Sequence, residues 1–317
     1  MRFGRIHFQL LLAGAILLFF MLRAPNFVSA GNLFALLQAF ALLGLLTLAV
    51  GLTMIAGEFD LSVGAMVSLA GLCTVKLGQD NVFLGIVIAA LTGLLVGVFN
   101  GFLFRYLRIS SLVVTVGTMI VLTGASFWIA GGRVVTYGNL DVSDWLEQTI
   151  LFVLSPRSSV TLIAFFLAWL LLGRTKAGRD IYATGSNRNA AEAAGARVTF
   201  SLVLVFALSG LISAVAGSLL SLSLATASAT LGTNLMLQAA SAAILGGVAL
   251  SGGVGNAFGM ALGAFTLSAL NNGLSIMGAN SPTILLSNGL LLLGVVLFDS
   301  LAERRENRLF QLRQGAQ

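Results

Sequence analysis

Histidine, cysteine, proline and charged residues are all scarce in this chain. Its 317 residues include one histidine, one cysteine and three prolines, and only 9% of them are charged. His7 has no second histidine with which to hold a metal, and Cys73 cannot form a disulfide within the chain. A Cys/His or Ser/His/Asp catalytic set therefore has no support in the sequence, which predicts neither an enzyme nor a cofactor site.

Apolar residues are what the chain has in abundance. They make up 58% of the sequence, and the mean hydropathy is +1.00. Soluble domains carry about 25% charged residues, so this composition predicts a polytopic membrane protein. The net charge of +6 does not indicate a nucleic-acid partner. The Lys and Arg residues cluster in loops beside apolar segments, which is the pattern of topology signals.

Ten apolar runs predict an all-α fold with about ten transmembrane helices, in a single domain of residues 1–317. Most runs approach the length needed to cross roughly 30 Å of hydrocarbon, although the sixth and the eighth are short. The runs cover residues 7–22, 33–55, 61–78, 82–104, 111–130, 159–173, 200–224, 234–250, 254–272 and 281–299.

The first run has features of a signal peptide. Arg2 and Arg5 precede it, and the small residues 28–30 (VSA) follow it. The alternative is an uncleaved anchor, which a multispanning chain can use as its first span. Residues 25–27 (PNF) are unfavourable before such a cleavage site, so we expect the anchor.

The basic residues predict an orientation. An even number of spans places both chain ends on one side, and if that side is the cytoplasm, 13 of the 17 basic residues are cytoplasmic. This bias predicts a multi-pass protein with both termini in the cytoplasm. The largest outside loop is then residues 131–158, where residues 144–146 (DWL) indicate the start of an interfacial helix with Trp145 at headgroup depth. A plain connecting loop and a docking surface both remain open for it.

The largest cytoplasmic loop, residues 173–199, carries five of the 17 basic residues. Within it, residues 186–195 (SNRNAAEAAG) predict a short helix that Ser186 or Asn187 caps and Gly195 ends. This polar helix has no apolar face to bury in lipid. We interpret it as an element that another protein binds.

A glycine-rich turn with two carboxylates, residues 56–64 (AGEFDLSVG), separates the second and third runs. Asp60 is expected to cap the following helix through the N–H of Ser62 or Val63, whereas Glu58 has no such local partner. The alternative assigns Asp60 to a transport gate or a cytoplasmic contact.

A second glycine-rich turn, residues 246–256 (GGVALSGGVGN), resembles a nucleotide-binding loop only superficially. The chain contains no GxxxxGK[ST] sequence, so no lysine is available for phosphates. The glycines instead suit a tight turn and close helix packing. Gly255, Gly259 and Gly263 are expected on one helix face.

Polar amides and threonines lie within several apolar runs, where each needs a partner. Interhelical hydrogen bonds alone would explain them, and the functional interpretation is that they line a translocation pathway. Asn271 and Asn272 lie about 100° apart on a helix, so at most one can point at the pathway and the other should bond a neighbouring helix. The pathway candidates are Asn100, Thr115, Asn234, Gln238, Asn271 and Asn272.

Acidic residues are confined to loops and span ends. A proton- or sodium-driven carrier usually needs an acid near the membrane centre, so the sequence disfavours that class of transporter. A membrane-embedded enzyme is disfavoured by the missing catalytic set.

Four motifs occur in order along the chain. Residues 57–64 (GEFDLSVG) are followed by 100–101 (NG) with 114–119 (VTVGTM), then by 178–187 (GRDIYATGSN), then by 246–255 (GGVALSGGVG) with 271–273 (NNG). Together they resemble the ribose-type permease family of bacterial ATP-binding-cassette (ABC) importers, over about residues 25–299. The motif residues carried over as structural are Gly57, Asp60, Ser62, Gly64, Gly246, Gly247, Gly252 and Gly253.

The resemblance implies a non-catalytic transmembrane subunit of a bacterial inner-membrane importer for a sugar, working by alternating access. Its implied partners are a second permease subunit, identical or paired, a periplasmic solute-binding protein, membrane lipid and a cassette ATPase. The ATPase would receive the short helix in a surface cleft. The residues implied in this coupling are Asn187, Arg188, Ala190, Glu192, Ala193 and Gly195.

The chain departs from the family pattern at two places. Glu58 stands where the family has a small residue, and Ser110-Ser111 replace the usual proline before the fifth run. The sugar therefore stays undetermined. A sibling permease for nucleosides or branched-chain amino acids is the nearest alternative.

Overall fold

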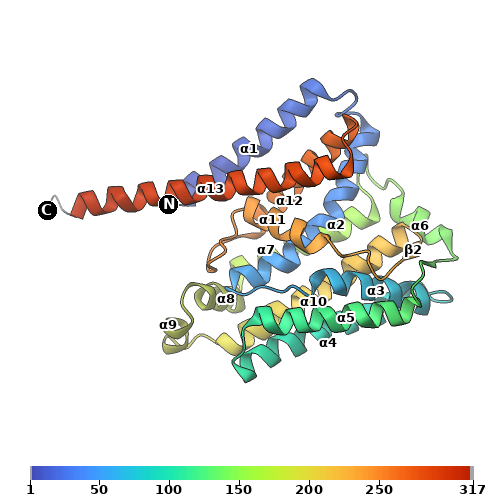
Figure 1. Cartoon of the computed structure of the whole chain (residues 1–317), viewed down its shortest axis with the longest axis horizontal. Coiled ribbons are helices and arrows are strands. Elements are labelled where there is room, and N and C mark those ends of the chain that lie inside the picture. Colours follow the sequence, from blue (N-terminus) through green and yellow to red (C-terminus); the bar gives the residue numbers. More distant parts are fainter. Residues whose placement is uncertain (1, 315–317) are drawn as a thin grey trace.

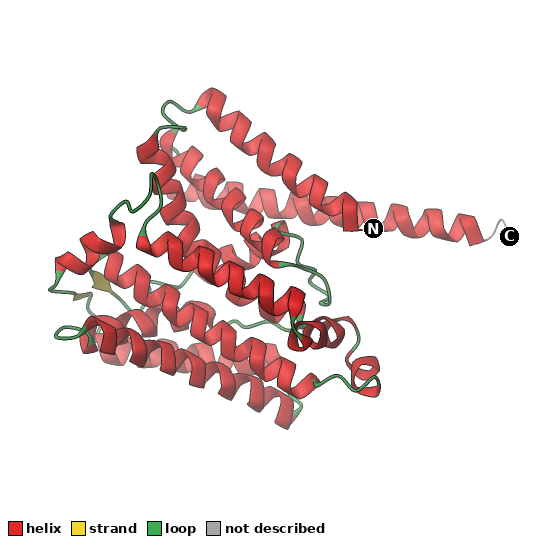
Figure 2. Ribbon diagram, turned by 180° about the vertical axis from the view of Figure 1, so that it is seen from behind, coloured by secondary structure: helices red, strands yellow, loops and turns green. Residues whose placement is uncertain are grey.

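A computed structural model describes the backbone of residues 2–314 and the side chains of residues 7–297. Helices dominate this part of the chain, and two short strands form the only sheet in it (Figures 1 and 2). In chain order the elements are α1 (Arg2–Arg23), α2 (Ala30–Ile55), α3 (Val63–Leu77), α4 (Val82–Leu107), α5 (Ser111–Ala130), β1 (Val135–Thr136), α6 (Leu140–Glu147), α7 (Pro156–Arg174), α8 (Lys176–Ser186), α9 (Arg188–Ala193), α10 (Val198–Ser223), β2 (Thr226–Ala227), α11 (Leu235–Leu245), α12 (Ala257–Ile276) and α13 (Ser281–Gln314).

Each of the ten predicted apolar runs forms a helix, which confirms the all-α class. Five of these helices, α2, α4, α5, α7 and α10, are long and apolar enough to cross a membrane. Shorter apolar helical segments lie in α1, α3, α11 and α13. Since a crossing needs about 20 apolar residues, the number of ten complete spans stays approximate.

Helix α11 is shorter than the sequence predicts, and glycines explain why, whereas α12 is shifted toward the C-terminus. The eighth run was expected over residues 234–250, but α11 ends at Leu245, because Gly246 and then Gly247, with φ +77°, turn the chain away. The ninth run was expected from residue 254, whereas α12 begins at Ala257 after an Asn256 cap. The last helix extends beyond the expected residue 299 to Gln314.

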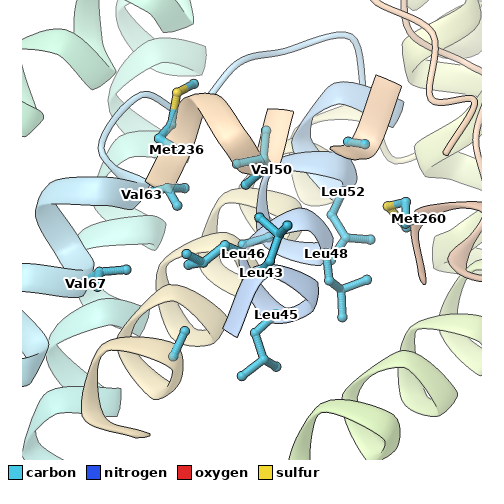
Figure 3. Close-up of a cluster of buried hydrophobic side chains, with 14 of the residues drawn as sticks. Leu43, Leu45, Leu46, Leu48, Val50, Leu52, Val63, Val67, Met236 and Met260 are labelled. Atoms are coloured by element: carbon cyan, nitrogen blue, oxygen red, sulfur yellow. The ribbon is translucent and has the colours of Figure 1, made fainter. Parts of the chain in front are cut away.

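Helix α2 lies at the centre of the core. Figure 3 shows its side chains, among them Leu45, Leu46, Leu48 and Val50, projecting on all sides of the helix. Each of these four is at most 2% exposed. Every residue from Leu43 to Ile55 is buried, so this part of α2 is surrounded by protein and not by lipid.

Glycines allow a close helix contact between α4 and α10. A Cβ atom at Gly93 would lie 2.3 Å from the Gly210 carbonyl oxygen, and one at Gly97 would lie 2.2 Å from the Phe206 carbonyl oxygen. Small residues four apart allow two backbones to meet in this way. The lack of side chains at Gly93 and Gly97 is therefore what lets α4 and α10 pack at this short distance.

The two ends of the bundle differ in content. In Figure 1, α8, α9 and both chain ends lie toward one end, while α6 and β2 lie toward the other. At that second end, β1 pairs antiparallel with β2, with Val135 opposite Ala227. Helix α6 begins at Leu140, capped by Asn139, and not at residue 144 as expected, although Trp145 is exposed within it.

Candidate functional site

The loop between α2 and α3 carries a buried carboxylate. Asp60 is 1% exposed and accepts hydrogen bonds from the Ser62 N–H (3.0 Å), the Ser62 hydroxyl (2.5 Å) and the Ser209 hydroxyl of α10 (2.8 Å). The expected bond from the Ser62 N–H is present, but Ser62 itself is the cap residue of α3, so Asp60 holds the turn before the helix and does not cap its first turn. A buried charge needs several donors of this kind, and here they tie the loop to α10.

Asn100 continues this polar network into α4 and α5. Its side chain is fully buried, donates to the Ser62 hydroxyl (3.2 Å) and accepts from the Thr118 hydroxyl (2.6 Å). Thr115, also fully buried, donates to the carbonyl of Ser111 one turn earlier (2.8 Å). The two bonds of Asn100 tie α4 to the α2–α3 loop and to α5, so a structural role explains Asn100 without a solute, whereas this bond of Thr115 lies within α5.

Three glycines from three different motifs meet at one point, which we call the glycine junction: Gly57, Gly185 and Gly252. A Cβ atom at Gly252 would lie 2.7 Å from the Gly57 Cα and 2.7 Å from the Gly185 carbonyl oxygen. One at Gly185 would lie 1.9 Å from the Ile55 carbonyl oxygen, to which the Gly253 N–H donates at 2.8 Å. Gly185 and Gly252 therefore have no room for a side chain, whereas Gly57 has room but a φ of +80°, which favours glycine.

The predicted helix of the 173–199 loop exists but is shorter than expected. It was expected over residues 186–195, and α9 covers Arg188–Ala193. Asn187 caps it by accepting from the Ala190 N–H (3.0 Å), while the Ser186 hydroxyl donates to the Tyr182 carbonyl of the preceding helix (2.9 Å). Gly195 has φ +79°, which confirms the expected left-handed end.

The sequence did not predict the helix before it. Residues 176–186 form α8, capped by Thr175, whose hydroxyl accepts from the Gly178 N–H (3.0 Å). The Tyr182 hydroxyl donates to the Gly255 carbonyl (2.6 Å), so α8 also holds the loop between α11 and α12. Two glycines and three charged residues in this segment concealed the helical signal.

Glu58 has a partner that is remote in sequence. It forms an ion pair with Arg188 of α9, 130 residues away. A second ion pair joins Glu192 of α9 to Arg105 of α4, and the Arg105 Nε donates to the Thr199 hydroxyl (3.0 Å). The two charged coupling candidates therefore contact the body of this chain.

The second glycine turn closes the contact between α11 and α12. A Cβ atom at Gly259 would lie 2.2 Å from the Gly246 carbonyl oxygen, and one at Gly263 would lie 2.1 Å from the Ala242 carbonyl oxygen. Gly255 was expected on the same face, but it precedes α12 and has φ +149°. Only Gly259 and Gly263 thus share the face of α12 that packs against α11.

The remaining pathway candidates do not form one cluster with Asn100. Asn272 exchanges two hydrogen bonds with Asn32 of α2 (2.9 and 3.0 Å), so it bonds a neighbouring helix. The adjacent Asn271 has a buried Oδ1 without a hydrogen-bond partner. At α11, the cap residue Asn234 is exposed and Gln238 is half-buried.

The start of α3 lies close to the segment that precedes α11. A Cβ atom at Gly64 would lie 2.6 Å from the Gly232 carbonyl oxygen.

A polar cluster around one arginine, at the opposite end of the bundle, was not identified from the sequence. Arg157, expected in an outside loop, is only 9% exposed at the start of α7. It donates to the Gln38 amide oxygen (2.9 Å) and the Ser223 hydroxyl (2.6 Å), and it pairs with Glu147 (3.0 Å). These bonds tie α7 to α2, α10 and α6.

A cavity of about 470 Å³ lies beside this cluster. Apart from Asp141, its lining is apolar: Val82, Ile86, Val142, Trp145, Leu146, Pro156, Val160, Val215, Leu219 and Leu222. A polyhydroxylated solute would find almost no hydrogen-bond partners there. Among the described residues, no three metal-ligating side chains come together.

Comparisons with known proteins agree with the motif pattern. A family model described as "Branched-chain amino acid transport system / permease component" matches residues 32–301. The ribose import permease protein RbsC of Bacillus subtilis (strain 168) is 33% identical over 279 residues, which cover 87% of this chain and 86% of that protein. The probable ABC transporter permease protein YphD of Escherichia coli (strain K12) is 34% identical, covering 94% and 91%.

A third relative has a different named solute. The autoinducer 2 import system permease protein LsrC of Yersinia pseudotuberculosis serotype O:3 (strain YPIII) is 34% identical, over 86% of this chain and 78% of that protein. No solved structure matches the chain.

Proposed function

The chain belongs to the family of permease components of ABC importers, and we propose that it translocates a sugar or sugar-like solute across the bacterial inner membrane. The observation that carries this proposal is its similarity, over most of its length, to permeases named for ribose and for autoinducer 2. Neutral amides within the bundle suit a polyhydroxylated neutral solute, because they can both donate and accept hydrogen bonds.

We infer that α9 is where a cassette ATPase binds. The helix lies at the end of the bundle that also holds both termini, and its positions 189, 190, 192 and 193 are exposed, as is its cap residue at 194. Together with the 13-to-4 bias of basic residues, this supports placing that end in the cytoplasm. A solute-binding protein would dock at the opposite end, and a second permease subunit, identical or paired, would complete the pathway.

Reconstitution tests the proposal directly. Proteoliposomes would contain this chain, its ATPase and its binding protein, with ATP on the side that faces the ATPase. We expect uptake of a labelled sugar that requires ATP and the binding protein and that survives collapse of the proton gradient. Uptake by this chain alone, driven by a proton or sodium gradient, would contradict the proposal.

A second candidate solute class follows from the family description, which names branched-chain amino acids. The same proteoliposomes distinguish the classes by competition. Excess unlabelled ribose should reduce uptake in the sugar case, whereas leucine should reduce it in the amino-acid case and adenosine in the nucleoside case. Reduction by leucine or adenosine alone would leave the importer intact and replace the sugar.

A further inference from the structure

The six-residue helix α9 has two distinct faces. Arg188, Ala191 and Glu192 follow the i, i+3, i+4 spacing of one face, and Ala191 is only 4% exposed. The opposite face consists of exposed positions: Asn189, Ala190, Ala193 and Ala194. Both charged residues of α9 therefore lie on the side that packs against this chain, where Glu192 stays exposed at the edge, and the opposite face is small and uncharged.

Arg188 holds α9 to the loop between α2 and α3. Its guanidinium forms the ion pair with Glu58 and lies 5.9 Å from the centre of the Phe104 ring. The Glu58 side chain is 12% exposed and that of Arg188 35%, so solvent screens this pair only in part. Removing one partner would leave the other charge unpaired in a mostly buried place, which is strongly unfavourable.

Glu192 holds the same helix to α4 and, indirectly, to α10. Its carboxylate pairs with Arg105, and Arg105 in turn reaches Thr199 at the start of α10. The Glu192 side chain is 44% exposed, so this pair is more screened than the first. We therefore expect Glu192 to contribute less than Arg188.

Glu58 lies two residues from Asp60, whose hydrogen bonds reach α10 directly and α4 and α5 through Ser62 and Asn100. A displacement of α9 would thus pull on Glu58 through the ion pair. Residues 58–62 of the same loop would pass this movement to the polar network that Asp60 and Ser62 form between the helices. The glycine junction lies at the other side of Glu58, at Gly57, and leaves that loop little freedom to absorb the movement.

We propose that Arg188 and Glu192 are positioning residues that transmit movement of α9 to the Asp60 network, and that the ATPase contacts only the uncharged face of α9. This inference rests on the proposed function. The partner surface would then be a shallow, uncharged hollow that accepts alanine side chains and one asparagine. Arg188 and Glu192 were first expected to contact the ATPase, and in this proposal they instead transmit the movement of α9 to the rest of the chain.

Charge reversal with rescue tests the inference. Arg188→Glu places two carboxylates together, and the swap Glu58→Arg with Arg188→Glu restores an ion pair of opposite polarity. Each variant is reconstituted with the ATPase and the binding protein, and two quantities are measured: ATPase co-purification and solute transported per ATP hydrolysed. We expect Arg188→Glu to keep the ATPase bound and to lower the transport ratio about tenfold, with the swap recovering most of it.

Two matched variants complete the design. Arg179→Glu makes the same charge reversal at an exposed position of α8 and should leave both quantities unchanged. Ala190→Trp enlarges the uncharged face and should abolish co-purification while the chain still elutes as a folded protein on size exclusion.

The outcomes separate this inference from the proposed function. If wild-type chain binds no ATPase, the proposed function fails. If Arg188→Glu releases the ATPase and the swap does not restore binding, Arg188 is an ATPase contact and the inference is wrong. If binding persists but the swap restores no coupling, the Glu58–Arg188 pair does not transmit movement, and the inference is equally wrong.

Discussion

At the scale of single residues, Asp60 combines full burial with a carboxyl group. Three hydrogen bonds from Ser62 and Ser209 offset the loss of water around its carboxylate. The sequence predicted the local bond to Ser62, because that partner is two residues away. It could not predict Ser209, since a partner 149 residues distant depends on how α10 packs.

Replacing Asp60 should destabilise the folded chain. Asp60→Ala leaves the hydroxyls of Ser62 and Ser209 without their acceptor, and we expect it to lower the free energy of unfolding by about 2–4 kcal/mol. Thermal unfolding of the purified chain in nanodiscs measures the effect. Asp80→Ala, at an exposed position, is the control and should change little. Equal midpoints for the two variants would contradict the role given to Asp60.

At the scale of elements, glycine separates helices that touch from helices that face lipid. Gly97 of α4 meets the Phe206 carbonyl, whereas Gly124 of α5 has no atom within 4 Å of the position of an added Cβ. The two glycines look alike in the sequence, since both lie in apolar runs. Only the helix contacts distinguish them.

This difference predicts opposite effects of one substitution. Gly97→Ala should force α4 and α10 apart and lower the free energy of unfolding by about 1–3 kcal/mol, because a backbone neighbour cannot rotate away. Gly124→Ala should be neutral or raise it by up to about 1 kcal/mol through helix propensity. Denaturant titration of each variant in detergent gives the comparison. A stabilising Gly97→Ala would show that α4 and α10 are not in backbone contact.

The end of α9 depends on one conformation at Gly195. An alanine at φ +79° is disfavoured by about 1–2 kcal/mol, and open space around the position means that no clash adds to this. Gly195→Ala should therefore speed amide hydrogen exchange of residues 188–195 about tenfold, and Gly195→Asn less, because asparagine tolerates this region. Gly173→Ala, also in open space, should leave the exchange unchanged. The same exchange rate in all three variants would refute the left-handed end.

At the scale of the whole molecule, composition and basic residues predicted most of the architecture. All ten apolar runs became helices, because long apolar segments have few other solutions in a membrane protein. What the sequence did not yield were α8, the burial of Arg157 and the partner of Glu58. Each of these depends on contacts between segments far apart in the chain, and periodicity within one segment carries no record of them.

The orientation of the bundle is testable with reporter fusions. With both termini and α9 at one end of the molecule, fusions after Arg188 and after Leu309 should both report the cytoplasm, and a fusion in the α6 segment should report the outside. A periplasmic signal from either of the first two sites would overturn the predicted topology.

The glycine junction also bears on how the sequence can evolve. Gly57, Gly185 and Gly252 belong to segments separated by more than 60 residues, yet the backbones at Gly57 and Gly185 fill the space that a methyl group on Gly252 would need. A substitution at Gly185 or Gly252 cannot be compensated by shrinking its neighbours, since these are backbone atoms and glycine is already the smallest residue. Descendants of this chain are therefore expected to keep all three together or to lose the loop arrangement entirely, so that the three positions behave as a single inherited character.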